Sequence, residues 1–240
     1  MTLVIAEFVG TALLLLLGNG VNANVILNKS KGNNSGWIVI AFGWAMAVFV
    51  GVYVSASLGG DGHLNPAVTI ADAVKTKDWS KVPWYLAAQM LGAMTGATLA
   101  WLSYRSHFNE TTDAEGMLAV FCNAPAIPDT INNLSTEIIG TFVLVFGAFS
   151  ISGAKISDVG ISLGALNALP VALLVFAIGL SLGGPTGYAI NPARDLGPRI
   201  VHFILPIKNK RDSNWSYSWI PVVGPIIGAL IAAIVFKALH

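Results

Sequence analysis

The tripeptides Asn65-Pro66-Ala67 and Asn191-Pro192-Ala193 decide the fold, because the same unusual unit stands twice in one apolar chain. Each copy follows a glycine-rich segment, residues 58–64 before the first and 182–190 before the second. Proline suits the first turn of a helix, where its missing N–H would have no partner anyway, and asparagine suits the capping position before it. Each copy therefore predicts a loop that turns abruptly into a helix.

The composition indicates a chain that lies mostly in lipid. Of its 240 residues 55% are hydrophobic and only 10% are charged, and the mean hydropathy is +0.70. A soluble domain carries about 25% charged residues. The net charge of +1 provides no basic patch for a nucleic acid. The single cysteine, Cys122, excludes an intramolecular disulfide and a paired-cysteine metal site. We expect no metal, no cofactor and no nucleic-acid partner.

Six segments reach the length of about 20 apolar residues that is needed to cross a bilayer: residues 3–27, 37–57, 82–104, 135–153, 162–181 and 219–239. Two shorter segments, 65–74 and 191–205, begin with the Asn-Pro-Ala units. Irregular backbone within a membrane is tolerated only where protein or a water-filled cavity covers it. The sequence thus predicts an all-α membrane protein with six transmembrane helices and two re-entrant half-helices.

The two halves of the chain repeat one another. Glu7-Phe8-Val9-Gly10-Thr11 matches Glu137-Ile138-Ile139-Gly140-Thr141, and each half carries one Asn-Pro-Ala unit. Because three spans per half is an odd number, the second half must enter the membrane from the opposite face. We expect one transmembrane channel domain over residues 1–240, built as an inverted repeat of 1–104 and 135–240 joined by a loop at 105–134.

Two half-helices that meet in the middle of a membrane favour a pore for neutral solutes. Each helix N-terminus carries about half a positive charge, which repels cations including hydronium. Asn65 and Asn191 are expected to turn amide donors into the lumen, and the glycine-rich segments to supply carbonyl acceptors. Arg194, three residues after Asn191, adds a guanidinium with several donors at one end of the pore. Asp195 could orient this arginine or face away from it.

Four titratable positions leave alternatives open. A carboxylate within a span is costly, so Glu7 and Glu137 either couple transport to protons or accept hydrogen bonds from the irregular loops. Their symmetric placement favours the second role. His63 either lines the pore or senses pH, or it is buried and bonded to backbone. Asp61 belongs to the glycine-rich segment before the first Asn-Pro-Ala, which is one residue longer than expected. It lies either at a pore mouth or in a solvated loop.

These features together resemble the aquaporins, the major intrinsic protein family, over essentially the whole chain. Asn191-Pro192-Ala193-Arg194-Asp195 and Phe121-Cys122-Asn123-Ala124-Pro125 look like the aquaglyceroporin branch, the glycerol facilitators. The resemblance implies a selectivity ring of Trp44, Gly179, Tyr188 and Arg194. Water-selective relatives carry histidine where Gly179 stands, which narrows the bore. Glycerol facilitators usually carry phenylalanine where Tyr188 stands, so its hydroxyl is a departure from their pattern.

We therefore expect a passive channel for glycerol, water and other small uncharged solutes that excludes ions and protons. The resemblance implies a multi-pass protein of the cell membrane that assembles as a homotetramer. Two alternatives stay open: a channel mainly for another neutral solute such as undissociated lactic acid, and a proton-coupled secondary transporter. An enzyme is not expected, because the histidines are scattered along the chain, at His63, His107, His202 and His240.

Overall fold

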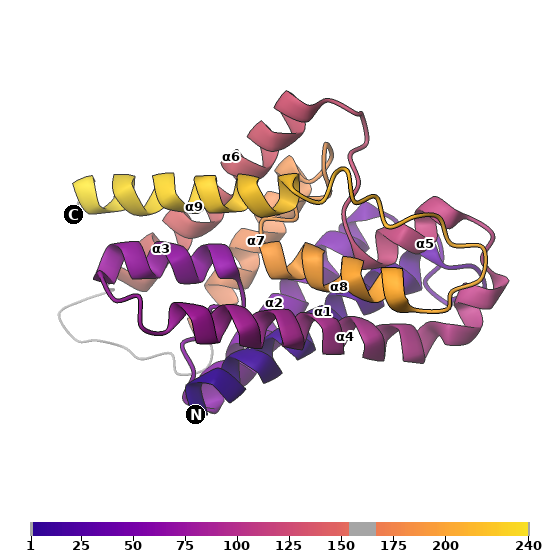
Figure 1. The fold of residues 1–240 in the computed structure, drawn as a ribbon, viewed down its shortest axis with the longest axis horizontal. Coiled ribbons are helices and arrows are strands. Elements are labelled where there is room, and N and C mark those ends of the chain that lie inside the picture. Colours follow the sequence, from indigo (N-terminus) through magenta and orange to yellow (C-terminus); the bar gives the residue numbers. More distant parts are fainter. Residues whose placement is uncertain (1, 154–166, 240) are drawn as a thin grey trace.

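The computed structural model describes residues 2–153 and 167–239, which form helices joined by loops (Figure 1). The long helices are α1 (Thr2–Ile26), α2 (Trp37–Ser57), α4 (Val82–Glu110), α6 (Thr130–Gly153), α7 (Ala168–Leu182) and α9 (Ile220–Leu239). The half-helices are α3 (Pro66–Thr76) and α8 (Pro192–Ile204), and a short helix, α5, spans Ala114–Phe121. The predicted all-α architecture is confirmed. Residues 162–166 of the predicted fifth span lie outside the described residues.

Among the described helices, α1, α2, α6 and α9 are long and apolar enough to cross a membrane by themselves. The described part of α7 is apolar but shorter, and α4 is 29 residues long with a more polar composition. Hydropathy therefore identifies four spans directly, and the remaining two are recognised by their place in the repeat.

The loop predicted at 105–134 is wrong in detail, because it is largely helical. Helix α4 continues to Glu110, α6 begins at Thr130, and α5 lies between them. Asp113 caps α5 by accepting a hydrogen bond from the Glu115 amide at 3.1 Å. Asp129 likewise accepts from the Asn132 amide at 3.0 Å in the first turn of α6. Hydropathy marks where a chain leaves the bilayer, whereas these local caps decide where a helix begins.

Glycines allow the long helices to cross closely in both halves. A side chain on Gly96 of α4 would overlap the Ala12 carbonyl of α1, and one on Gly228 of α9 would overlap the Ile138 carbonyl of α6. Small residues at such crossings let helix backbones approach one another within membranes. The pairs α1–α4 and α6–α9 hold equivalent places in the two halves. In the middle of the molecule, α3 and α8 run outward in opposite directions (Figure 1).

Candidate functional site

The two half-helices begin where the sequence predicted. Helix α3 starts at Pro66 and α8 at Pro192, each directly after its asparagine. The Asn65 side-chain oxygen accepts from the Ala67 amide at 2.9 Å, and the Asn191 oxygen accepts from the Ala193 amide at 3.0 Å. Both caps satisfy amides that a helix start leaves without a partner.

The same asparagines also join the two halves of the chain. Asn65 Nδ2 donates to the Ile190 carbonyl at 2.8 Å, and Asn191 Nδ2 donates to the Leu64 carbonyl at 2.8 Å. The sequence predicted that these amides turn into the lumen. Each amide donates one hydrogen to the opposite half, and since an amide carries two such hydrogens, one remains for the cavity that both asparagines line.

The residues before the two asparagines have a strained backbone. Leu64 has φ of 49° and Ile190 has φ of 44°, values that side-chain-bearing residues rarely adopt. Such conformations cost about 1–3 kcal/mol and persist only when their surroundings enforce them. The positive φ angles turn the carbonyls of both residues toward the asparagine of the other half.

Two buried carboxylates hold these strained residues in place. Glu7 accepts from the amides of His63 at 2.7 Å and Leu64 at 2.8 Å. Glu137 accepts from the amides of Ala189 at 2.9 Å and Ile190 at 2.8 Å. Each carboxylate also accepts a hydrogen bond from a side chain: Gln89 donates to Glu7, and Thr186 donates to Glu137. The carboxylate contacts thus repeat residue by residue between the halves.

Two cavities enter the molecule from its two ends. The first, of about 290 Å³, is lined by Asn65 and Asn191 and by mainly apolar side chains of α2, α6 and α7, and we call it the α3 cavity. The second, of about 220 Å³, lies beside α5 and is called the α5 cavity. Trp44, Tyr188 and Arg194 line both cavities. These three residues, called the filter below, therefore surround the place where the two cavities meet.

The Arg194 guanidinium contacts the Trp44 ring and has a donor that no described residue pairs with. Its guanidinium carbon lies 4.0 Å from the centre of the Trp44 ring, within range of a cation–π contact. Its Nη1 atom is buried and has no hydrogen-bond partner among the described residues. A donor left unsatisfied in this way is costly unless something that passes through the site pairs with it.

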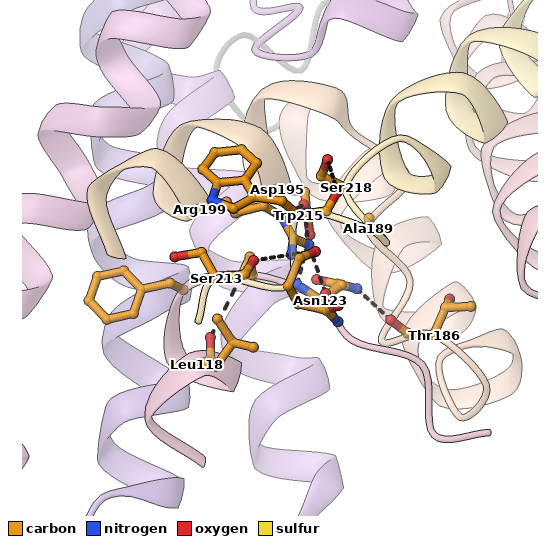
Figure 2. A network of polar contacts seen from close by, with 12 residues as sticks. Leu118, Asn123, Thr186, Ala189, Asp195, Arg199, Ser213, Trp215 and Ser218 are labelled. Atoms are coloured by element: carbon orange, nitrogen blue, oxygen red, sulfur yellow. Dashed lines mark hydrogen bonds and ion pairs between the residues drawn. The ribbon is translucent and has the colours of Figure 1, made fainter. Parts of the chain in front are cut away.

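Asp195 is paired with Arg199 and belongs to a buried polar network (Figure 2). Arg199, fully buried, donates to Asp195 at 2.7 Å, to the Asn123 carbonyl at 2.8 Å and to the Ser213 carbonyl at 2.7 Å. Asn123 in turn donates from its amide to Asp195 and from its side chain to the Thr186 carbonyl, both at 2.7 Å. The network joins α8 to the end of α5 and to the loop at Thr186, two residues before the filter residue Tyr188. Sequence reasoning missed Arg199, although its spacing of four from Asp195 was a usable signal.

Gly179 lies directly against the filter residue Tyr188, and its place in the predicted selectivity ring stays a prediction. The Tyr188 ring fills the space beside it: a Cβ on Gly179 would lie 2.8 Å from Tyr188 Cζ and 2.9 Å from its hydroxyl. Trp37 closes this corner, donating to the Gly179 carbonyl at 3.0 Å and packing edge-on against Tyr188 at 5.9 Å. The glycine therefore makes room for Tyr188, and the tyrosine forms the wall.

Asp61 and His63 both line the α3 cavity near its mouth. The His63 ring lies 3.2 Å from the Thr69 hydroxyl. Asp61 accepts hydrogen bonds from Lys81 at 2.8 Å and from the Tyr85 hydroxyl at 2.7 Å. Partial burial opposes ionisation of Asp61, but these hydrogen bonds outweigh it, so the pKa of Asp61 lies below its ordinary value. Asp61 is thus a paired residue of the pore mouth.

A bundle of membrane helices around two opposed half-helices, with cavities that meet at a polar constriction, defines a membrane channel. The family model described as "Major intrinsic protein" matches residues 1–236. The chain belongs to the major intrinsic protein family.

Individual relatives agree with this family over nearly their whole length. The chain is 55% identical to the probable glycerol uptake facilitator protein of Thermotoga maritima, covering 99% of both chains. It is 54% identical to the glycerol uptake facilitator protein of Streptococcus pneumoniae, covering 96% of both. The fold matches the X-ray structure of the aquaglyceroporin from Plasmodium falciparum with a TM-score of 0.86 and 30% identity, covering 98% of this chain and 95% of that one. The family and these names indicate a channel rather than an enzyme.

Proposed function

We propose that this protein is a passive channel of the cell membrane for glycerol, water and other small uncharged solutes. The observation that carries the proposal is the meeting of two cavities at Trp44, Tyr188 and Arg194. Two aromatic rings offer an apolar wall to a carbon chain, and the free donors of Arg194 face its hydroxyl groups. A small polyol has this two-sided character. The names of the relatives support the same solute.

The exclusion of ions follows from the charges around the filter. Arg194 carries a fixed positive charge, and the N-termini of α3 and α8 add their partial positive charges near Asn65 and Asn191. Glu7 and Glu137 line neither cavity, and they accept hydrogen bonds from the loop amides. We assign them a structural role. The carboxylates that do line the α3 cavity, Asp61 and Asp72, are paired with Lys81 and Lys75, which does not favour proton coupling.

We extend the proposal to a homotetramer embedded in lipid, as the family resemblance implies. Large apolar side chains are exposed on the outer faces of several helices, among them Ile38, Leu91 and Ile234. Such an apolar belt suits contact with lipid tails or with neighbouring protomers. Sedimentation of the purified protein in detergent distinguishes a tetramer from a monomer.

Stopped-flow light scattering on proteoliposomes tests the proposed channel. Glycerol entry is expected to be fast relative to protein-free liposomes and insensitive to a proton ionophore. Urea and undissociated lactic acid at low pH, measured in the same way, rank the solutes. Saturable entry that an ionophore abolishes would establish a transporter, and faster entry of lactic acid than of glycerol would establish a different solute.

Replacing Arg194 by alanine is expected to raise the leak of protons and cations and to reduce the differences in permeability among glycerol, urea and lactic acid. The substitution removes the fixed charge and the free donors of the filter. Arg194→Lys is the matched control, because it keeps the charge without the planar fork, so ion exclusion should survive better than solute ranking. A pH-sensitive dye inside the liposomes measures the leak. An unchanged leak and ranking in Arg194→Ala would remove this residue from the filter.

A further inference from the structure

We propose that Asn22 of α1 is a positioning residue of the filter: it fixes the Trp44 ring and makes that ring present only carbon to the solute. The inference rests on the proposed glycerol channel and deepens it. Trp44 Nε1 donates to Asn22 Oδ1 at 2.9 Å, and Asn22 Nδ2 donates to the Ala119 carbonyl of α5 at 2.9 Å. Asn22 is 7% exposed and lines the α5 cavity directly beside the filter.

The Trp44 ring is fixed by α1 through packing as well as through this hydrogen bond. Gly18, one turn before Asn22, leaves the space that the ring occupies, because a Cβ there would overlap three ring atoms. Arg194 lies over the same ring at 4.0 Å. Packing sets the place of the ring, and Asn22 sets the direction of its one polar atom.

The hydrogen bond decides what Trp44 offers to a solute. The indole N–H is the only polar group of the side chain and acts only as a donor. Since Asn22 accepts this donor, the Trp44 ring contributes an apolar wall, and the polar groups of the filter without a partner among the described residues are those of Arg194 and the Tyr188 hydroxyl. Without the acceptor, a buried N–H would have to pair with water or with the solute, because an unpaired one is costly. The apolar corner that suits a carbon chain would then become polar.

A neighbouring asparagine separates this role from ordinary helix packing. Asn19 of α1 donates to the carbonyls of Val120 at 2.8 Å and Phe121 at 3.3 Å, so it also fastens α5 to α1. It lines neither cavity and has no hydrogen bond to Trp44 within the described residues. Asn19 and Asn22 thus share the anchoring of α5, and only Asn22 contacts the filter.

The experiment compares the glycerol-to-urea permeability ratio of proteoliposomes that carry wild type, Asn22→Leu, Asn22→Ala or Asn19→Leu. Glycerol has a carbon chain that needs the apolar wall, whereas urea is a small planar amide without one. The ratio is expected to fall by about threefold to tenfold in both Asn22 variants, the range that loss of one hydrogen bond produces. Asn19→Leu is expected to keep the wild-type ratio.

A double-mutant cycle tests whether the effect passes through the indole. In a Trp44→Phe background the N–H is absent, so Asn22→Leu should change the ratio no further. An unchanged ratio in the single Asn22 variants, an equal fall in Asn19→Leu, or a full additional fall in the Trp44→Phe background would each overturn the inference. The wild-type measurement judges the proposed function separately, because a wild type that does not conduct glycerol refutes the channel whatever the variants do.

Discussion

Replacing Glu137 by leucine is expected to abolish solute conduction and to lower the yield of folded protein sharply. The carboxylate accepts hydrogen bonds from the amides of Ala189 and Ile190 and from the Thr186 hydroxyl. Leucine would leave both amides without this partner at a buried position. Each buried unsatisfied group costs about 1–3 kcal/mol, so the two amides alone cost about 2–6 kcal/mol. That is a large share of the stability of a typical protein.

The strained backbone adds to this loss. Ile190, with φ of 44°, would no longer be held by its amide, and the Ile190 carbonyl would no longer be aimed at Asn65. Thermal unfolding in detergent and glycerol flux measure the two consequences. Glu137→Gln keeps one acceptor oxygen and should give an intermediate result, and Glu110→Gln, on the exposed end of α4, is the control for loss of a charge. Normal flux through Glu137→Leu would contradict the structural role.

Replacing Gly179 by histidine is expected to cut glycerol permeability by about tenfold to hundredfold, if overpacking of about 1–3 kcal/mol is transmitted to the filter. Any Cβ at this position would lie 2.8–3.1 Å from atoms of the Tyr188 ring. Trp37 packs against the same ring, so Tyr188 would have to move toward the passage. Water permeability should fall much less, because a water molecule is smaller than glycerol.

A graded series makes this prediction sharper. Gly179→Ala should show a smaller loss than Gly179→His, and adding Tyr188→Phe to it should restore part of the flux, since the hydroxyl lies 2.9 Å from the added Cβ. Gly20→Ala is the matched control, because nothing lies within 4 Å of a Cβ on this α1 glycine. Equal losses of glycerol and water permeability in Gly179→His would show that Gly179 does not set the width of the filter.

Features that depend on local chemistry could be predicted from the sequence. The starts of α3 and α8 follow from the capping properties of asparagine and the fixed backbone of proline. The close crossing of α1 and α4 depends on glycines of α4 such as Gly92 and Gly96, whose helical spacing is visible in the sequence. Glu7 and Glu137 could be linked to the loops because their symmetric placement left few other roles.

Features that depend on distant contacts could not be predicted. The direction of the Tyr188 side chain is decided by Trp37 and Gly179, which lie on two other helices. For this reason the sequence could place Gly179 and Tyr188 in one ring but could not show that the tyrosine ring packs against the glycine. The partners of Arg199 come from residues 123 and 213 as well as from its own helix. Only the folded chain brings such groups together.

The crossed hydrogen bonds between the half-helices have a consequence for the order of assembly. Asn65 finds its carbonyl partner 125 residues further along the chain, and the Leu64 carbonyl finds its donor 127 residues away. A chain that has left the ribosome only as far as α5 carries one half-helix start but lacks Ile190 and Asn191, which pair with it from the second half. The paired half-helices therefore form at the same stage of synthesis as the complete pore. A chain that ends at α5 has no complete pore through which ions could leak.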